Sequence, residues 1–358
     1  MTCGENSHDL KGRILYWDVI KCLAIFFVVW QHVISFLQPN SVWGGQPDLV
    51  ASFILSFHMP LFMLVSGYFA RSVFYTAVSV MVKRKSIQLL LPSFSSYFFI
   101  GILLIILRNE DFTNGMISLI GYCTISFWYL KTLFFFYVFA SLVFSSRSSH
   151  NVLTFILCLL GGLVVLLYSE QFDSYFRFFS MLPYFVAGLL FYRWEEYIFS
   201  KKYCFLVVSA LLYVLFTSYW ATNEYDMYGH PFAMNIQSLK LFLIRTVIGL
   251  SGSVFLILFI REICKALENF YVLCVLGKFG TYTLGIYVFS SELVRFLQLY
   301  GRTKLENVFT FDGTFLNSLI YDFLICLPIS IIIIMLSVIL IKIIRLNRYS
   351  RIILLGEK

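Results

Sequence analysis

The sequence has little of the charge that a soluble domain carries on its surface. Lys, Arg, Asp and Glu make up 13% of its 358 residues, whereas soluble domains average about 25%. Only 7 prolines and 20 glycines are present, which excludes collagen-like and low-complexity chains. The eight cysteines are scattered and form no C-x-x-C pair. We interpret them as small apolar side chains rather than as disulfides or metal ligands.

Hydrophobic residues take the place of charged ones. They make up 60% of the sequence, and aromatic residues make up 19%. A mean hydropathy of +0.84 excludes a single water-soluble core, because too little polar surface is left to cover it. The apolar runs are continuous rather than alternating, which favours membrane-spanning helices over outer-membrane strands.

We therefore predict an all-α membrane protein with about ten transmembrane helices. The predicted helices cover residues 14–37, 49–70, 86–106, 126–145, 152–168, 176–194, 204–220, 238–261, 273–299 and 316–345. The ninth contains Gly277, Gly280 and Gly285, which allow it to begin as a short surface segment. We expect residues 1–358 to form a single transmembrane domain, with short tails at about 1–13 and 346–358 and no appended soluble domain.

The distribution of basic residues predicts the topology. If the N-terminus is cytoplasmic, most Lys and Arg residues fall in cytoplasmic segments, and external loops hold only Arg108, Arg302 and Lys304. Because cytoplasmic loops collect Lys and Arg, we predict that both termini are cytoplasmic. Topology then explains the net charge of +8, and we predict no nucleic-acid partner.

The first two predicted helices contain ionisable residues. Asp18, Lys21 and His32 lie in the first helix, and His58 lies in the second. Lys21 and His32 differ by only about 20° around the helix and about 16 Å along it, so they share one face with Asp18. An ionisable side chain inside a membrane is costly and indicates function. Two alternatives stay open: Asp18 and Lys21 can snorkel to the interface, and His58 can hydrogen-bond a neighbouring helix and fix packing.

Six stretches of the sequence resemble motifs of the acyltransferase-3 family, in the family's order. They are Tyr16–His32, Phe57–Tyr68, Lys83-Arg84 with Leu91-Pro92, Phe127–Leu133, Pro183–Gly188 and Leu276–Tyr287. The first resembles a family pattern of an aspartate, a basic residue and a histidine, which are here Asp18, Lys21 and His32. Two positions depart from the family: Lys21 stands where arginine is most frequent, and Ser290 stands where some members have a late histidine. The resemblance covers nearly the whole chain.

The resemblance implies an integral acyltransferase of the bacterial cytoplasmic membrane. Such enzymes move an acyl group, usually acetyl from acetyl-CoA, to a hydroxyl of a cell-surface polysaccharide or of its lipid-linked precursor. His32 is then the candidate general base, or alternatively a transient acyl carrier. Asp18 would pair with Lys21 or position a polar chain toward the histidine. His58 would orient the acceptor or donate a hydrogen bond to the developing oxyanion.

The remaining candidate residues would bind the two substrates. Those expected to hold the phosphates of the acyl donor are Arg71, Lys83, Arg84 and Lys85, although anionic lipids also explain a basic cluster of this kind. Those expected to contact the acceptor are Ser66, Trp128, Tyr129, Lys131 and Tyr287, although Trp and Tyr also form interfacial belts. No residues have the spacing of metal ligands, so no metal is predicted.

A second class of function is a proton-coupled exporter of a glycan or of a lipid-linked intermediate. A charged helix face and two histidines within the membrane would also suit proton coupling. The sequence shows no inverted repeat, which disfavours this alternative. Acetyl transfer by the purified protein distinguishes the two classes.

Overall fold

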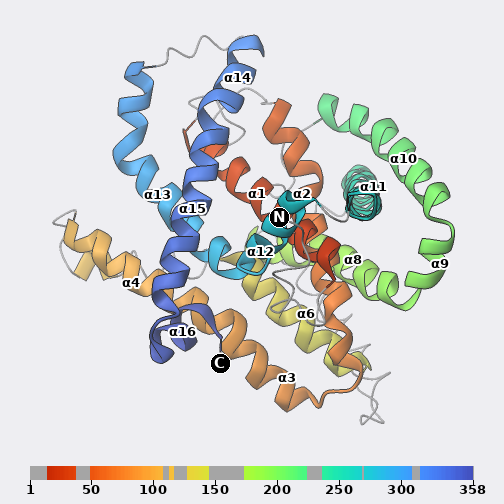
Figure 1. Cartoon of the computed structure of the whole chain (residues 1–358), viewed down its shortest axis with the longest axis horizontal. Helices are drawn as coiled ribbons and strands as arrows, with labels where there is room; N and C mark the ends of the chain where they lie inside the picture. Colours follow the sequence, from red (N-terminus) through yellow and green to blue (C-terminus); the bar gives the residue numbers. More distant parts are fainter. Residues whose placement is uncertain are drawn as a thin grey trace. The chain divides into compact units, whose positions relative to one another are not determined.

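The computed structural model describes residues 14–37, 49–107, 113–116, 127–144, 173–223, 236–267, 270–308 and 315–357. Every element in these ranges is helical, and they contain no strand (Figure 1). The all-α prediction is therefore confirmed over this part of the chain. Apolar sequence favours helices because each backbone N–H and C=O finds its partner within the same segment. The predicted helix 152–168 lies outside the described residues.

The chain divides into two compact units. Unit 1 comprises Met1–Val65, Arg193–Met227 and Lys240–Ile339, and unit 2 comprises Ser66–Tyr192, Tyr228–Leu239 and Leu340–Lys358. Several helices begin in one unit and end in the other.

The first helix is the centre of unit 1. The helices of this unit are α1 (Leu15–Leu37), α2 (Leu49–Tyr68), α9 (Glu195–Ser200), α10 (Lys202–Asn223), α11 (Ile236–Ala266), α12 (Tyr271–Gly280), α13 (Thr283–Val308), α14 (Phe315–Tyr321), η5 (Asp322–Cys326) and α15 (Leu327–Ile344). Helix α1 packs against α12, α13 and η5. Buried Val19, Cys264 and Leu273 form a shared core between α1, α11 and α12.

Unit 2 is built around α6. Its helices are η2 (Phe69–Phe74), α3 (Val78–Lys85), η3 (Ser86–Leu90), α4 (Leu91–Leu107), α6 (Trp128–Phe144), α8 (Asp173–Arg193) and α16 (Arg348–Leu355). Helix α6 packs against η2, α3 and η3, and α16 packs against α4 and η3. A Cβ atom on Gly67 would overlap the carbonyl oxygen of Phe185, so glycine allows the end of α2 to lie directly on the backbone of α8.

Two π-helical turns have a common local cause. The turns η3 and η5 are each followed directly by a Leu-Pro pair, Leu91-Pro92 and Leu327-Pro328. Proline has no N–H, and its ring clashes with the carbonyl group four residues earlier. In both helices that carbonyl lies within the π turn, whose wider hydrogen-bond spacing accommodates the clash.

Among the described residues, four helical segments are long and apolar enough to cross a membrane, namely Leu15–Leu37, Leu49–Phe74, Lys240–Ala266 and Leu316–Ile344. Helices α12 and α13 make a fifth if they count as one span, although they meet at an angle of 74°. The ninth predicted helix is therefore two helices, with the break just after Gly280. The count of ten spans and the cytoplasmic termini stay predictions.

The described cysteines differ in state. Cys22, Cys204, Cys264 and Cys326 are free thiols, as expected for small apolar side chains. Cys274 forms a disulfide, so the interpretation from the sequence is wrong at this position. The sequence carries no local signal for this bond, because Cys274 has no neighbouring cysteine.

Candidate functional site

An ion pair joins Asp18 and Lys21 on α1. The Lys21 Nζ lies 3.0 Å from Asp18 Oδ1, because residues three apart are neighbours on a helix surface. Asp18 is 4% exposed, while the Lys21 side chain is 26% exposed. The second carboxylate oxygen, Oδ2, is buried and accepts no hydrogen bond from any described residue. The pair thus neutralises the buried carboxylate and leaves one of its oxygens available.

Two glycines allow α12 to approach this ion pair. A Cβ atom on Gly280 would overlap the backbone carbonyl oxygen of Asp18. A Cβ atom on Gly277 would lie 2.8 Å from Leu15 Cδ1 and 3.9 Å from Asp18 Cβ. Only glycine permits so close an approach at position 280. Gly277 and Gly280 therefore allow the end of α12 to pack directly on the backbone of α1 at Asp18.

The two membrane histidines lie near each other in unit 1. A positive charge on His32 would act on His58, so the two rings lie within electrostatic range of each other. His58 is 2% exposed, and His32 is half-buried beside the ring of Phe36, with the ring centres 6.2 Å apart. Neither nitrogen of His32 forms a hydrogen bond with a described residue.

The tautomer of His58 follows from its hydrogen bond. Its Nδ1 lies 2.8 Å from the carbonyl oxygen of Ile54, and a carbonyl oxygen can only accept a hydrogen bond. Nδ1 therefore carries the proton, and Nε2 of the neutral ring presents a lone pair. This bond is made within α2, so the alternative of a hydrogen bond from His58 to a neighbouring helix is not seen among the described residues.

Helix α13 contributes further buried polar residues to unit 1. Tyr287 is 8% exposed, Ser290 is 2% exposed and Glu292 is 8% exposed. Ser290 places a hydroxyl group on this part of α13. At the far end of α1, the Trp30 Nε1–H donates to the carbonyl oxygen of Asp322 over 3.3 Å, which ties α1 to η5.

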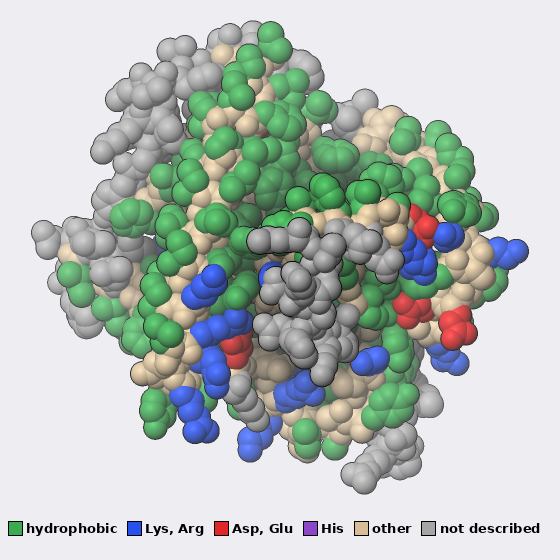
Figure 2. Space-filling view, in the orientation of Figure 1, with side chains coloured by type: hydrophobic (Ala, Val, Ile, Leu, Met, Phe, Trp, Pro, Cys, Tyr) green, Lys and Arg blue, Asp and Glu red, His purple; other side chains and the backbone are tan. Residues whose placement is uncertain are grey.

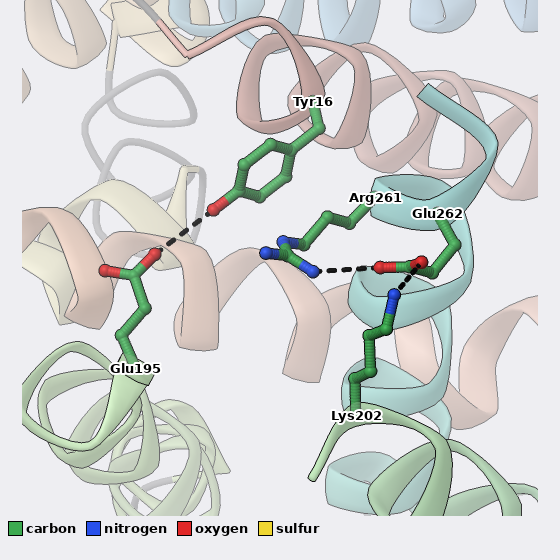
Figure 3. Close-up of polar contacts among 5 residues, drawn as sticks. All are labelled: Tyr16, Glu195, Lys202, Arg261 and Glu262. Atoms are coloured by element: carbon green, nitrogen blue, oxygen red, sulfur yellow. Dashed lines mark hydrogen bonds and ion pairs between the residues drawn. The ribbon is translucent and has the colours of Figure 1, made fainter. Parts of the chain in front are cut away.

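A polar cluster near the start of α1 was not expected from the sequence. The Arg261 Nη1 lies 2.8 Å from Glu262 Oε1, and the Lys202 Nζ lies 2.5 Å from Glu262 Oε2 (Figure 3). The Tyr16 hydroxyl donates to Glu195 Oε1 over 3.2 Å in the same region (Figure 3). The adjacent opposite charges of Arg261 and Glu262 were the one signal in the sequence.

The Arg261 guanidinium connects the ion pairs of Glu262 with the hydrogen bond between Tyr16 and Glu195. It lies 3.6 Å from the centre of the Phe199 ring and 6.0 Å from that of Tyr16, as expected for cation–π contacts. The cluster fastens α1, α9, α10 and α11 to one another. All its charged groups are paired, so we assign it a structural role.

In unit 2, a chain of polar contacts connects candidates for donor binding with candidates for acceptor binding. The Lys85 Nζ lies 3.7 Å from the centre of the Tyr137 ring. The Tyr137 hydroxyl donates to the carbonyl oxygen of Ser66 over 3.4 Å, and the Ser66 and Tyr129 hydroxyls lie 2.9 Å apart. Tyr137 was missed because it is one of 23 tyrosines and no motif marks it.

The surroundings of Lys85 lower its pKa. Burial, and then the positive charge of Arg84, lowers the pKa of Lys85 from 10.5 to about 8. Lys85 pairs with no described carboxylate. Two adjacent cations with no anionic partner in the described ranges make a suitable site for a phosphate group.

The remaining predicted residues of unit 2 are more exposed. Lys83 and Arg84 are exposed on α3, and the exposed Arg71 lies 5.8 Å from the Tyr192 ring centre. Trp128 meets Tyr129 edge to face, with ring centres 6.3 Å apart. The Lys131 Nζ lies 5.7 Å from the Phe94 ring centre.

The sequence model of the acyltransferase-3 family, described as an acyltransferase domain, matches residues 14–342. The chain belongs to the acyltransferase-3 family. This acyltransferase-3 protein has no match among curated proteins, and no solved structure matches it. Membership supports two coarse conclusions: acyl transfer is its chemistry, and its apolar helices are those of a multi-pass membrane protein.

The matched region contains every candidate residue described above. Within the described residues, no group of three His, Cys, Asp or Glu side chains could hold a metal ion. The candidate side chains include imidazoles, a carboxylate, lysines and phenols. Such groups suit proton transfer and anion binding.

Proposed function

We propose that this acyltransferase-3 protein transfers acetyl from acetyl-CoA to a sugar hydroxyl. The acceptor is a cell-surface polysaccharide or its lipid-linked precursor, and the enzyme lies in the bacterial cytoplasmic membrane. The observation that carries the proposal is the proximity of His32 and His58, whose ring nitrogens, apart from the Nδ1 of His58, form no hydrogen bond with a described residue. A thioester is already activated, so the enzyme needs chiefly a base and a means of positioning the acceptor.

In the proposed reaction, His32 takes the proton of the acceptor hydroxyl as its oxygen attacks the thioester carbonyl carbon. The new C–O bond forms, the C–S bond breaks, and the proton passes to the departing thiolate. The products are the acetyl ester and free CoA.

The tautomer of His58 favours one of its two candidate roles. With Nδ1–H donated to Ile54, the neutral ring can accept a hydrogen bond at Nε2 but cannot donate one there. His58 is therefore proposed to orient the acceptor hydroxyl. Donation to an oxyanion would require a second proton on the ring.

The charged pair on α1 is proposed to hold the histidine face in place. Lys21 neutralises Asp18 at 3.0 Å, so α1 can keep a buried carboxylate beneath α12. The available Oδ2 of Asp18 offers an acceptor for a polar group that approaches along this face. Both residues are positioning groups in this scheme.

The donor's phosphates are proposed to bind Lys85 and Arg84, with Lys83 and Arg71 as additional positive charge. Cation–π contact fixes the Lys85 ammonium without neutralising it. Ser66, Trp128, Tyr129, Lys131 and Tyr287 are proposed to contact the acceptor. The direct hydrogen bond between Ser66 and Tyr129 supports a shared role for these two.

The test compares His32→Ala with His230→Ala, a histidine outside the described residues that the sequence places in a loop. A deletion strain would be complemented with each variant at equal membrane level, and O-acetyl groups on the purified polysaccharide would be measured by NMR. We expect wild type and His230→Ala to restore acetylation, and His32→Ala to abolish it. Full acetylation with His32→Ala would exclude its role as base or carrier. A polysaccharide unchanged by the deletion itself would refute the proposed acceptor.

A further inference from the structure

The helix α16 begins directly after the last apolar segment. Helix α15 ends at Ile344, and a turn of three residues leads into α16 at Arg348. The Asn347 side chain caps the new helix by accepting a hydrogen bond from the Tyr349 N–H over 2.8 Å. Gly356 ends it with a φ of +64°, the left-handed conformation that glycine adopts readily. Both ends of this eight-residue helix are therefore defined.

One side of α16 packs against other helices of unit 2. Arg345 makes two hydrogen bonds to Glu357, with Nε to Oε2 at 2.9 Å. The Ser95 hydroxyl donates to the carbonyl oxygen of Ile353 over 2.6 Å. A Cβ atom on Gly356 would lie 2.5 Å from the carbonyl oxygen of Ile87. These contacts hold α16 against η3 and α4.

Large apolar side chains are exposed in the turn before α16 and on α16 itself. Leu346 is 87% exposed, Tyr349 is 76% exposed and Ile353 is 39% exposed. Tyr349 and Ile353 are four residues apart and so lie on the same face. Exposure of this extent beside the end of a span suits contact with acyl chains rather than with water.

Positive charge without a counterion surrounds these apolar side chains. Lys342 and Arg348 are exposed, and neither pairs with a carboxylate in the described ranges. The Nε of Arg351 is buried and has no hydrogen-bond acceptor there. Figure 2 shows Lys and Arg side chains gathered over α16 and the adjoining end of α15. Glu357 pairs with Arg345.

We propose that α16 lies in the membrane interface and binds anionic phospholipid headgroups. Lys342 and Arg348 contact the phosphates, and Leu346 and Tyr349 insert among the acyl chains. A soluble anion would explain the charges but would leave the exposed Leu346 and Tyr349 in water. A leaflet of anionic lipid meets both requirements, and it lies beside α16 because the helix follows the end of a span. This proposal does not depend on the acetyl-transfer reaction.

The test uses the whole chain with Tyr349→benzoylphenylalanine, reconstituted in vesicles of equal phosphatidylcholine and phosphatidylglycerol. Irradiation crosslinks position 349 to adjacent molecules, and mass spectrometry gives the ratio of the two lipid adducts. We expect phosphatidylglycerol to be enriched by about fivefold for each unpaired charge near the headgroup. About 1 M salt should reduce the enrichment, because the Debye length falls to about 3 Å.

The matched variants each remove two exposed charges. Lys342→Gln/Arg348→Gln should bring the adduct ratio close to that of the vesicle, while Lys201→Gln/Lys265→Gln, both exposed in unit 1, should leave it unchanged. Folding of each variant would be checked by its thermal unfolding in detergent. An adduct ratio equal to that of the vesicle in the parent protein would overturn headgroup binding. An equal loss of phosphatidylglycerol enrichment in both double variants would overturn the assignment of headgroup binding to α16. An absence of any lipid adduct would overturn the insertion of Tyr349 among the acyl chains.

Discussion

The ammonium group of Lys85 lies 3.7 Å from the centre of the Tyr137 ring. A cation on an aromatic face is stabilised without losing its net charge. In a carboxylate pair that charge would be cancelled. Lys85 is therefore held in place and still able to attract an anion, which is what a phosphate site requires.

Affinity for CoA should fall as the pH rises through about 8. Burial and the charge of Arg84 lower the pKa of Lys85 to about 8, so Lys85 is charged below that pH and neutral above it. Phosphate groups are already ionised at pH 7, so only the lysine changes. The Kd of CoA, measured by isothermal titration in detergent, should rise about tenfold between pH 7 and pH 9.

Lys85→Arg is the control for this pH dependence. Arginine stays charged throughout the range, so the variant should bind CoA equally at both pH values. A wild-type Kd that stays constant from pH 7 to pH 9 would contradict the role of Lys85.

Removal of Lys21 should destabilise the protein more than its replacement by arginine. Lys21→Met leaves Asp18, which is 4% exposed, as an unpaired buried carboxylate. Because Lys21 itself is partly exposed, the expected loss is about 1–3 kcal/mol. Lys21→Arg keeps the charge and should lose less. Thermal unfolding in detergent measures both.

The double variant Asp18→Asn/Lys21→Met tests the reason for that loss. It removes the carboxylate as well as its partner, so it should recover part of the stability. If the double variant were as unstable as Lys21→Met alone, packing rather than charge would be the cause.

Two substitutions at His58 should separate its two nitrogens. His58→Asn places an amide near the position of Nδ1, so the hydrogen bond to Ile54 is retained and Nε2 is lost. We expect unfolding close to that of wild type and a rate lowered at least about a hundredfold. His58→Gln places its amide near Nε2, loses the bond to Ile54 and should lose stability as well. Full activity of a folded His58→Asn would make His58 a packing residue.

Arg261 should matter more to stability than Lys202, although both bind Glu262. The Arg261 side chain is 11% exposed and lies on the Phe199 ring. In the ion pair between Lys202 and Glu262, each side chain is 25% exposed. Arg261→Lys loses the planar group that stacks and should cost about 1–2 kcal/mol. Lys202→Gln should cost less, because its ion pair is screened by solvent. Equal losses in thermal unfolding would show that stacking contributes nothing.

The helices were predictable because their cause is local. Continuous apolar runs gave α1, α2, α6 and α8 with ends within a few residues of those predicted. The break between α12 and α13 was harder to place, because glycine permits a bend without requiring one. The sequence also suggested more spans than the described helices establish by length and hydropathy.

The site was predictable only where one helix contains the whole pattern. Asp18 and Lys21 pair because three residues separate them. The contacts of Lys85 with Tyr137 and of Arg261 with Phe199 depend on which helices become neighbours. Helical periodicity gives the face of each helix and leaves its partner undetermined, so neither contact could be found from the sequence.

The seating of Gly280 on the backbone of Asp18 bears on how a genetic screen of this protein would be interpreted. Every substitution at position 280 adds a Cβ atom that must push α12 away from α1, so every allele should score as a loss of function. Judged by phenotype alone, substitutions at Gly280 would be grouped with those at the histidines, although glycine has no side chain that could act in the chemistry. Its alleles should be recognisable by low protein levels, and by partial rescue at lower growth temperature, which loss of a catalytic group would not show.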